Sequence, residues 1–393
     1  MNEKLILAVT GSVAAYKAPF ILRLLRERGF RTPVVVTEAA LKFVGRATFE
    51  SLSTEGVYDD LWARREALNH ISLLEDAKLV IVAPATANTI AKTACGIADN
   101  LLSSLLLAAD PRALLFAPAM NSGMWNNPAT QENIQTLKSR GVTFVEPGTG
   151  ELACGVRGKG RLAELDEIVL ACERIVRANP QLSGKKVVVT AGRTQEQIDP
   201  VRVITNRSSG RMGREIALAF ARAGARVTLV AAETCVPPPP GIETLRALSA
   251  SLMLQTLKKL MPETDVLVMA AAVADYSPVE LSSAKIKQEK LTLSLAKTPD
   301  ILSSLNEYDA IKIGFSVETG DDWHQTAKKK LETKGLDAIV ANPASVISSE
   351  ETEAKIIYSS GETLDFPRAS KAELAERIVS IAGEIIQARR TNA

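Results

Sequence analysis

Residues 4–37 of the chain read KLILAVTGSVAAYKAPFILRLLRERGFRTPVVVT. The stretch opens on a short apolar run that ends near Gly11 and Ser12, a pattern typical of a buried strand closed by a tight turn. Apolar residues then recur at helical spacing, and the segment closes with a second apolar run at 32–37. This order of strand, turn, helix and strand predicts a βαβ unit of a parallel sheet.

Similar apolar runs continue through the first half of the chain, at 78–83, 113–117 and 142–145, with helical or loop segments between them. We therefore expect residues 1–182 to form one doubly wound α/β domain.

A polar joint at 179–186, NPQLSGKK, precedes a second copy of the same architecture. Strands and helices alternate again after it, which predicts a second doubly wound, Rossmann-like α/β domain over residues 183–393. The expected strands are 186–190, 226–231, 266–272 and 311–315, and the expected helices are 211–223 and 371–389.

The composition argues against several classes of protein. Of the 393 residues, 46% are hydrophobic and 23% charged, and the formal net charge is +2, unlike a disordered chain or a dedicated nucleic-acid binder. Two histidines and four cysteines show no metal-ligand spacing, so no structural zinc is expected. We expect no membrane span and no secretory leader, and scattered cysteines suit a reducing compartment, so the cytoplasm is the expected location.

Two loops that follow predicted strands are candidates for ligand binding. In the loop at 10–13, Gly11 permits an unusual backbone angle and Ser12 can cap the next helix, whose free N–H groups suit a phosphate. The loop PATAN at 84–88 is small and hydroxylated, so a flat cofactor can approach closely. An ordinary connection between strand and helix is the alternative for each loop, and the first lacks the G-x-G-x-x-G fingerprint.

Asn121 follows the predicted strand 113–117 and offers both donors and an acceptor, which suit a substrate carboxylate or amide. Met124 and Trp125, close by, are expected in the core. His70 is a candidate catalytic residue, with a structural histidine as the alternative.

Cys154 lies in a basic segment with five glycines between 148 and 160. We expect this segment to be a mobile flap rather than a regular element, and a thiol on such a flap is a functional candidate. An adventitious thiol is the alternative.

Five motifs of the first half occur in a fixed order: GSVAAYK, NHISL, PATANT, PAMNSGMW and ACGVRGKGRL. Together they resemble the flavin-dependent cysteine decarboxylases, in particular the phosphopantothenoylcysteine decarboxylases. The resemblance implies a flavodoxin-like fold with bound FMN. In that family the substrate's cysteine thiol is oxidised to a thioaldehyde, CO2 leaves, and the ene-thiol is reduced to 4′-phosphopantetheine.

By matched position, the resemblance implies that His70 is the active-site histidine, Asn121 binds substrate and Cys154 donates the proton of the reductive step. The FMN contacts that it implies are Gly11, Ser12, Val13, Thr37, Pro84, Thr86, Ala87 and Asn88. It also implies a homo-oligomer: decarboxylase domains form trimers with the active site between subunits, and a dodecamer is the larger assembly to test.

The second half carries a long loop with Ser, Gly and Arg just before the predicted helix 211–223, where a nucleotide phosphate can bind at a helix N-terminus. Glu233 follows Gly213 by 20 residues and ends the next predicted strand, as the ribose-binding acid does in NAD enzymes. Spacing alone therefore leaves open a flavoprotein reductase that uses NAD(P)H.

A second ordered set of motifs is TAGRT, IDPVR, NRSSGRMG, AAVADY and KIK. It resembles the phosphopantothenate–cysteine ligases, and the whole chain resembles the bacterial bifunctional proteins of coenzyme A biosynthesis. The resemblance implies three substrates, 4′-phosphopantothenate, cysteine and CTP, with Mg²⁺ on the triphosphate. CTP activates the carboxylate as an acyl-cytidylate, and the cysteine amine then displaces CMP.

The resemblance assigns Lys285 to acyl-cytidylate formation and Asn206 to its conversion. The CTP contacts that it implies are Met269, Ala270, Ala271, Asp275, Lys285, Pro299, Asp300, Ile301, Leu302, Phe315, Lys330 and Lys334. For each lysine alone, a solvated surface residue is the alternative.

Two residues depart from the family's pattern: Arg193 replaces a glycine of Thr-Ala-Gly-Gly-Thr, and Gln288 replaces a lysine of Lys-x-Lys-Lys. Because Asn206 and Lys285 are in place, these departures bear on rates or nucleotide preference rather than on the reaction. A third reading, a non-enzymatic regulatory subunit, is disfavoured because His70, Asn121 and Cys154 are all present and a long acidic tail is absent.

Overall fold

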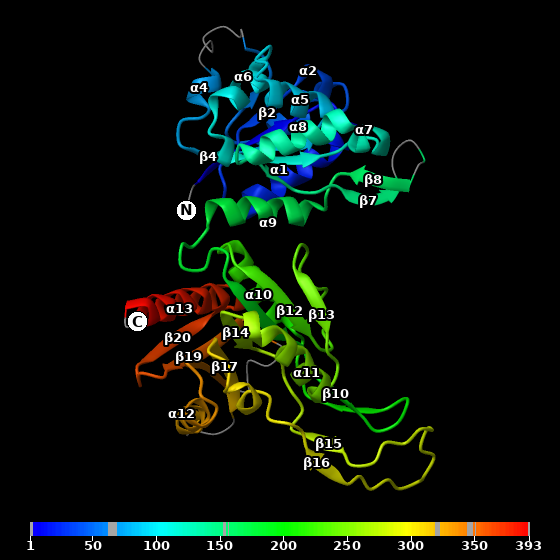
Figure 1. The fold of residues 1–393 in the computed structure, drawn as a ribbon, viewed down its shortest axis with the longest axis vertical. Coiled ribbons are helices and arrows are strands. Elements are labelled where there is room, and N and C mark those ends of the chain that lie inside the picture. The colour runs from blue at the N-terminus through cyan, green and yellow to red at the C-terminus, as the bar shows by residue number, and fades with distance from the viewer. Residues whose placement is uncertain are drawn as a thin grey trace. The chain divides into compact units, whose positions relative to one another are not determined.

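The computed structural model describes residues 3–61, 69–151, 155, 157–318, 323–343, 349 and 351–391. The chain divides into two compact units, Met1–Val176 and Arg177–Ala393 (Figure 1). The predicted division after residue 182 is close to this one, and its position stays a prediction. No helix in the described part of the chain is long and apolar enough to cross a membrane.

The first unit is built on a six-stranded parallel sheet in the order β3-β2-β1-β4-β5-β6. Its strands are β1 (Lys4–Val9), β2 (Val34–Val36), β3 (Val57–Tyr58), β4 (Ala77–Ala85), β5 (Leu114–Pro118) and β6 (Thr143–Phe144).

β1 shows why its sequence is apolar at nearly every position. Leu5, Leu7 and Val9 point into the core on one face of the sheet, and Ile6 and Ala8 point into the core on the other. All five are fully buried. A parallel strand covered by helices on both faces has no polar side, so the continuous run that predicted a buried strand is explained.

Helices cover both faces of this sheet. The first core contains residues of α1 (Ala18–Glu27), α3 (Arg46–Leu52) and α9 (Leu165–Val176). The second contains residues of α5 (Ala87–Cys95), α6 (Leu101–Ala108), α7 (Ser122–Asn126) and α8 (Pro128–Ser139). Shorter elements are the 3₁₀ helices η1 (Val13–Lys17) and η2 (Pro111–Ala113), and the helices α2 (Glu38–Leu41) and α4 (Asn69–Ser72). The predicted doubly wound architecture is confirmed for this unit.

The glycine-rich segment forms an antiparallel hairpin, β7 (Gly148–Glu151) with β8 (Arg157–Arg161). The prediction of a mobile flap without a regular element was therefore wrong for the described residues. Composition misled because glycines are also required where a strand packs closely on another segment, as the site shows below.

The second unit has an eight-stranded sheet in the order β13-β12-β9-β14-β17-β18-β19-β20, parallel as far as β18 and antiparallel for the last two strands. The strands are β9 (Lys186–Ala191), β12 (Arg226–Ala231), β13 (Glu243–Arg246), β14 (Val266–Met269), β17 (Ile311–Glu318), β18 (Ala338–Pro343), β19 (Glu351–Tyr358) and β20 (Thr363–Ser370).

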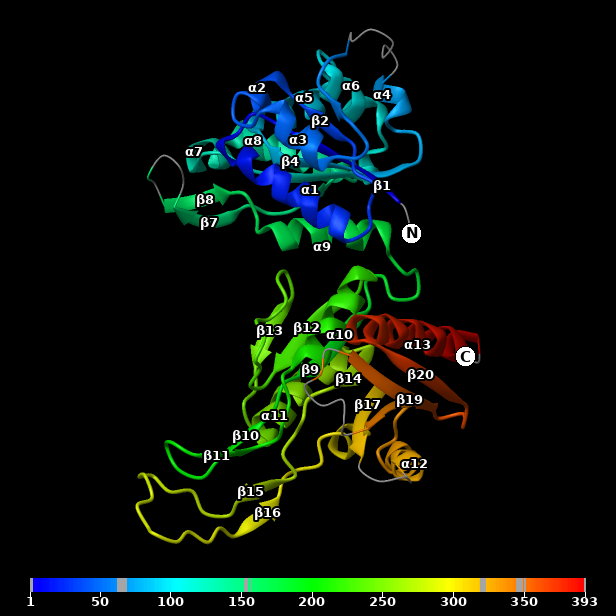
Figure 2. The same cartoon turned by 180° about the vertical axis from the view of Figure 1, so that it is seen from behind.

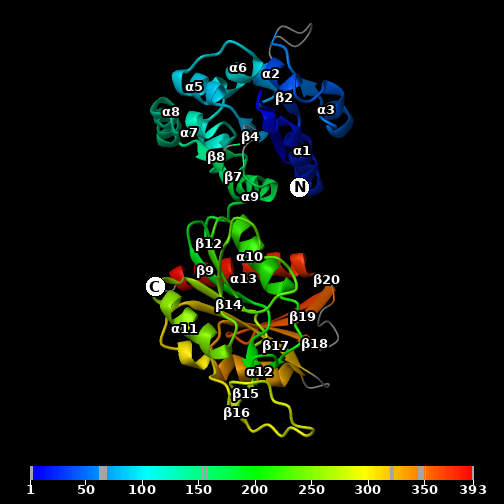
Figure 3. The same cartoon turned by 90° about the vertical axis from the view of Figure 1, so that its right-hand side faces the viewer.

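Its helices lie in two layers (Figure 3). α11 (Ala250–Leu260) and α12 (Trp323–Thr333) contribute to one core, and so do the short 3₁₀ helices η3 (Met261–Glu263) and η4 (Ser303–Leu305). α10 (Arg211–Arg222) and α13 (Lys371–Thr391) pack against each other and against other strands of the sheet.

Two hairpins extend from the ends of strands: β10 (Gln195–Gln197) with β11 (Val203–Thr205), and β15 (Tyr276–Pro278) with β16 (Leu295–Lys297). Figure 2 shows that β15 and β16 carry a long loop away from the sheet. We call residues 276–297 the arm. Lys285 lies on it.

Candidate functional sites

Thr10 ties together the carboxyl ends of the two central strands of the first unit. Its buried hydroxyl donates to the carbonyl oxygen of Pro84 (2.6 Å) and accepts from the N–H of Thr86 (3.1 Å). Ser12 continues the connection by donating to the carbonyl of Ala119 (3.2 Å). The loops after β1, β4 and β5 thus meet where the strand order reverses, which is where open α/β sheets bind ligands.

Three hydroxyl side chains at this edge cap the helices that follow. Ser12 accepts from Ala14 N (3.3 Å) before η1, Thr37 accepts from Ala40 N (3.2 Å) before α2, and Thr86 accepts from Thr89 N (3.3 Å) before α5. The predicted cap at Ser12 is confirmed. The first turns of these helices, together with small side chains at 84–88, fit a flat cofactor that carries a phosphate.

Gly11 is required because of close packing. Its backbone is not in the left-handed region, so it does not use the unusual angle that a glycine permits. Instead, a Cβ atom on Gly11 would lie 2.5 Å from the Cβ of Ala39. The glycine lets the turn after β1 pack directly against α2.

The β7–β8 hairpin packs on the loop after β5. The N–H of Met120 donates to the carbonyl of Gly160 (3.0 Å). A Cβ on Gly160 would lie 2.2 Å from the Met120 oxygen, and a Cβ on Gly158 would lie 2.3 Å from Ser122 Oγ. The hairpin is therefore anchored beside Asn121. Cys154, between its two strands in sequence, lies outside the described residues.

The other residues predicted for this site have different positions. Asn121 caps α7 by accepting from Gly123 N (2.8 Å), which orients its exposed side chain. His70 lies in α4, but its side chain is outside the described part. Trp125 is buried as predicted, whereas Met124 is 50% exposed, so its assignment to the core was wrong. Adjacent residues of an α-helix project about 100° apart, so one of the two can be buried while the other is exposed.

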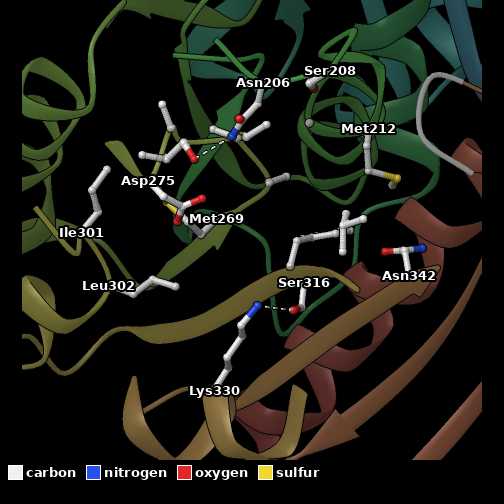
Figure 4. Close-up of a pocket in the computed structure, with 18 of the residues that line it drawn as sticks. Asn206, Ser208, Met212, Met269, Asp275, Ile301, Leu302, Ser316, Lys330 and Asn342 are labelled. Atoms are coloured by element: carbon white, nitrogen blue, oxygen red, sulfur yellow. Dashed lines mark hydrogen bonds between the residues drawn. The ribbon is translucent and has the colours of Figure 1, made fainter. Parts of the chain in front are cut away.

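The second unit contains a pocket of about 1010 Å³ (Figure 4). Asn206 lines it, together with eleven of the twelve residues predicted to contact CTP: Met269, Ala270, Ala271, Asp275, Pro299, Asp300, Ile301, Leu302, Phe315, Lys330 and Lys334. These residues come from five separate stretches of sequence. Their convergence is a property of the fold, because the carboxyl ends of parallel strands share one edge of the sheet.

Two buried threonines position the alanine-rich wall of the pocket. Thr190 Oγ1 accepts from Ala271 N (3.0 Å), and Thr194 Oγ1 accepts from Ala274 N (2.9 Å). Both threonines are fully buried. Beyond Met269, the backbone N–H groups of Ala271 and Ala274 bond to these side chains instead of to a neighbouring strand. β14 therefore ends at Met269 and not at residue 272 as predicted.

The first residues of α10 form another part of the pocket wall. Gly210 has a φ of 79° at the N-cap, and a Cβ on Gly213 would lie 2.6 Å from the carbonyl oxygen of Thr190. A Cβ on Gly210 would lie 2.6 Å from Thr234 Cγ2, so both glycines allow the start of α10 to pack closely on neighbouring segments. Asn206 is oriented by donating from Nδ2 to the carbonyl of Val273 (2.9 Å), as Figure 4 shows.

Lys330 and Lys334 reach the pocket from α12 and the turn after it. Lys330 Nζ donates to Ser316 Oγ (3.0 Å), and Lys334 Nζ lies 3.5 Å from a carboxylate oxygen of Asp300. Burial alone raises the pKa of Asp300, but a bond from Ser303 N and the Lys334 charge hold that pKa below its ordinary value. Both lysines are half-buried, whereas Lys328 and Lys329 on the same helix are exposed.

Lys285 is the predicted contact that does not line the pocket. It is exposed on the arm, and the next residue, Ile286, is hydrogen-bonded to Asp199. Asp199, buried, accepts from Ile286 N (3.2 Å) and pairs with Arg202 Nε (3.0 Å). The Arg202 guanidinium also donates to the Ile286 carbonyl. The IDPVR and KIK motifs are thus one structural unit.

Asp199 stays ionised because its partners outweigh burial. Burial raises its pKa, but backbone donors at Val201, Arg202 and Ile286 and the charge of Arg202 hold the pKa below the ordinary value.

Several pocket residues were missed by the sequence reasoning. They include Ser316, Asn342, Thr352 and Lys371. Asn342 is buried and donates from Nδ2 to Thr352 Oγ1 (3.0 Å) and to the Glu353 carbonyl (2.7 Å). The sequence of 206–213 predicts a phosphate-binding loop, but no local sequence pattern marks the pocket residues that follow residue 315.

Glu233, the acid that suggested NAD(P)H, does not line the large pocket. It lines a separate pocket of about 230 Å³ at the end of β12 and lies 3.7 Å from Arg246. Glu233 therefore does not support the interpretation of the large pocket as an NAD(P)H site.

Arg193 braces the loop that precedes α10. Its guanidinium donates to the carbonyl of Ser208 and to Cys235 Sγ (3.3 Å), and its backbone bridges to Glu233 and Ala272. The departure from glycine thus adds a side chain that contacts the loop rather than the pocket itself. Arg193 does not line the pocket.

Both halves match known families. Residues 1–177 match the Flavoprotein model, and residues 182–385 match the DNA/pantothenate metabolism flavoprotein C-terminal domain. The coenzyme A biosynthesis bifunctional protein CoaBC of Mycobacterium tuberculosis (strain ATCC 25618 / H37Rv) is 41% identical over 400 residues, covering 96% of this chain and 95% of the relative. The chain belongs to the CoaBC family.

A CoaBC protein of Bacillus subtilis (strain 168) is 39% identical over 391 residues, covering 96% of both chains. A crystal structure of the C-terminal domain of a CoaBC protein is 33% identical, covers 53% of this chain and 99% of that chain, and has a TM-score of 0.47. The predicted α/β fold and the predicted enzyme class are confirmed: the chain is a bifunctional phosphopantothenoylcysteine synthetase and decarboxylase with a flavoprotein domain.

Replacement of Thr10 by Val, which has the same shape, is expected to destabilise the first unit. It leaves the Pro84 carbonyl without its buried donor, at a cost of roughly 1–3 kcal/mol. We expect a lower Tm and reduced flavin content in the purified protein, measured by calorimetry and by absorbance. The control is Thr48→Val on the exposed surface of α3. Full stability and full flavin content in Thr10→Val would show that the connection is dispensable.

Replacement of Asp199 by Ala is expected to release the Lys285 segment. Because small displacements of catalytic groups are costly, we expect phosphopantothenoylcysteine synthesis to slow by roughly 10–100-fold. Decarboxylation of supplied phosphopantothenoylcysteine is expected to stay unchanged. Glu289→Ala, at an exposed carboxylate on the same arm, is the matched control. Equal rates of synthesis in the Asp199 and Glu289 variants would contradict the positioning role.

Proposed function

We propose that the second unit condenses 4′-phosphopantothenate with cysteine at the expense of CTP, and that the first unit uses FMN to convert the product to 4′-phosphopantetheine. The observation that carries the first step is the pocket, which brings Asn206, Asp275 and Lys330 together from distant parts of the sequence. Its size suits a nucleotide with an acyl substrate.

Activation is required because a carboxylate is a poor electrophile. The carboxylate attacks the α-phosphorus of CTP, forms the acyl-cytidylate and releases pyrophosphate. The cysteine amine then attacks the acyl carbon, and CMP leaves. Lys285 is proposed to stabilise the charge that develops in the first step, and Asn206 to orient the acyl-cytidylate in the second.

Magnesium is proposed to bind through the phosphates. Among the residues that the structure describes, no cluster of three or more His, Cys, Asp or Glu side chains could hold a metal. Mg²⁺ ordinarily takes few protein carboxylates and several phosphate or water oxygens, so this arrangement fits a metal carried by CTP.

The first unit fits FMN through its capped helix ends and its small loop at 84–88. FMN supplies the two-electron oxidation and reduction that the conversion requires. The residues proposed to contact it are the eight named above, from Gly11 to Asn88. Asn121 is proposed to hold the substrate, His70 to act at the reacting centre and Cys154 to return a proton to the ene-thiol carbon.

An assembly of several copies is part of the proposal. Val13, Tyr16, Phe20 and Phe43 are each about half exposed and lie on or next to the helices that follow β1 and β2. Burial of such large apolar side chains against a second copy of the chain would remove them from water. We propose a trimer of first units, with a dodecamer as the larger form; a monomer in native mass spectrometry would contradict both. A cytoplasmic location stays a prediction.

Purified yellow protein supplied with 4′-phosphopantothenate, cysteine, CTP and Mg²⁺ is expected to yield 4′-phosphopantetheine, CO2, CMP and pyrophosphate. Asn206→Asp is expected to accumulate the acyl-cytidylate, and Cys154→Ser to stall at the oxidised ene-thiol, both followed by mass spectrometry. Normal turnover by either variant would contradict the role proposed for the substituted residue. Bleaching of the flavin by NADPH, with no CMP formed, would instead favour the reductase.

Lys330→Met is expected to weaken CTP binding by roughly ten- to hundredfold, because a hydrogen bond to a charged group is worth about 1.5–3 kcal/mol. Lys329→Met removes the same charge from the exposed face of α12 and is expected to have no effect. The KM for CTP measures both. Similar values for the two variants would mean that Lys330 does not contact the nucleotide.

A further inference from the structure

Two cationic residues to which the motifs assign no role line the same pocket. Arg211 is the first residue of α10, and Lys371 is the first residue of α13. They are 160 residues apart in sequence, and they come together because these two helices pack against each other (Figures 1 and 3).

The ammonium group of Lys371 has no counter-ion within the described part of the chain. Burial and the neighbouring charge of Arg211 together lower its pKa from the ordinary value. Two like charges on one half-buried wall destabilise each other, and a bound anion would relieve that repulsion.

The nearby acids of α13 are engaged elsewhere. Glu373 accepts from the N–H of Ser370 (2.9 Å) and from its hydroxyl (2.7 Å), as a helix cap. Glu376 pairs with Arg222 at 3.6 Å. Lys334, which also lines the pocket, differs from Lys371 because its ammonium group already pairs with the carboxylate of Asp300.

We propose that Arg211 and Lys371 form a phosphate-binding subsite of this pocket. The subsite lies where the loop with Ser208 and Gly210 enters α10, so backbone N–H groups, hydroxyls and two cations converge on one anion. The inference rests on the proposed function, because both of the proposed substrates carry phosphate: CTP in its triphosphate and 4′-phosphopantothenate in its monoester.

The test uses Lys371→Gln, which removes the charge and keeps most of the chain length, and Lys371→Arg, which keeps the charge. Dissociation constants of the full-length protein for CTP, CMP and 4′-phosphopantothenate are measured by isothermal titration calorimetry. Lys371→Gln is expected to weaken one phosphate ligand at least roughly tenfold, as loss of a charged hydrogen bond does. Lys371→Arg is expected to restore most of the affinity, and Lys328→Gln, on the exposed face of α12, to change nothing.

The ligands distinguish the source of the phosphate. Weaker CTP binding with unchanged CMP binding assigns the subsite to the β- and γ-phosphates, and weaker 4′-phosphopantothenate binding assigns it to the monoester. Arg211→Gln is the second variant and is expected to affect the same ligand. A circular dichroism spectrum and a thermal unfolding transition that match those of the unaltered protein show that each variant is folded.

Unchanged binding of all three ligands in both Gln variants would overturn the subsite. That result is distinct from failure of the proposed function, in which the unaltered protein itself would bind neither CTP nor 4′-phosphopantothenate.

Discussion

A buried threonine hydroxyl at the end of the first strand of each unit holds that unit's site together. Thr10, just after β1, bonds to the backbone of Pro84 and Thr86 at the end of β4. Thr190, in β9, bonds to the backbone of Ala271 after β14. In both sheets, the two strands are direct parallel neighbours. The hydrogen bond fixes the loop after one strand relative to the end of the neighbouring strand.

This connection matters because parallel strands end without the turn that would join them. Their final backbone groups must find partners outside the ladder, and an unpaired buried polar group is costly. A threonine supplies both a donor and an acceptor in a small volume. In the second unit, the loop that Thr190 fixes carries Asp275 beyond β14. In the first unit, the neighbouring hydroxyl of Ser12 donates to the carbonyl of Ala119, on the loop beyond β5 that carries Asn121.

Much of this arrangement could be predicted from the sequence. The apolar run of β1, the repeated alternation of strands and helices, and the convergence of strand ends follow from periodicity and from the rules for parallel sheets. The motifs TAGRT and AAVADY were visible as separate patterns. That Thr190 and Thr194 bond to the second motif was not, because a hydrogen bond between residues about 80 apart leaves no local signal.

The errors have physical reasons too. The β7–β8 hairpin was read as a flap because glycines permit both disorder and close packing, and only the contact with Met120 decides between them. Lys371 escaped notice because it reaches the pocket through the packing of α13 on α10, which depends on the whole sheet. Pairwise tertiary contacts of this kind are what sequence periodicity cannot encode.

The most direct measurement of this account is the kinetics of both half-reactions in a Thr190→Val variant of the full chain. The substitution removes the hydroxyl that accepts from Ala271 N and keeps the shape of the side chain. The account predicts a fall in kcat/KM for phosphopantothenoylcysteine synthesis, by roughly the tenfold that one lost hydrogen bond represents, with decarboxylation of supplied substrate unchanged. An unchanged kcat/KM for synthesis would contradict the claim that this hydroxyl organises the site.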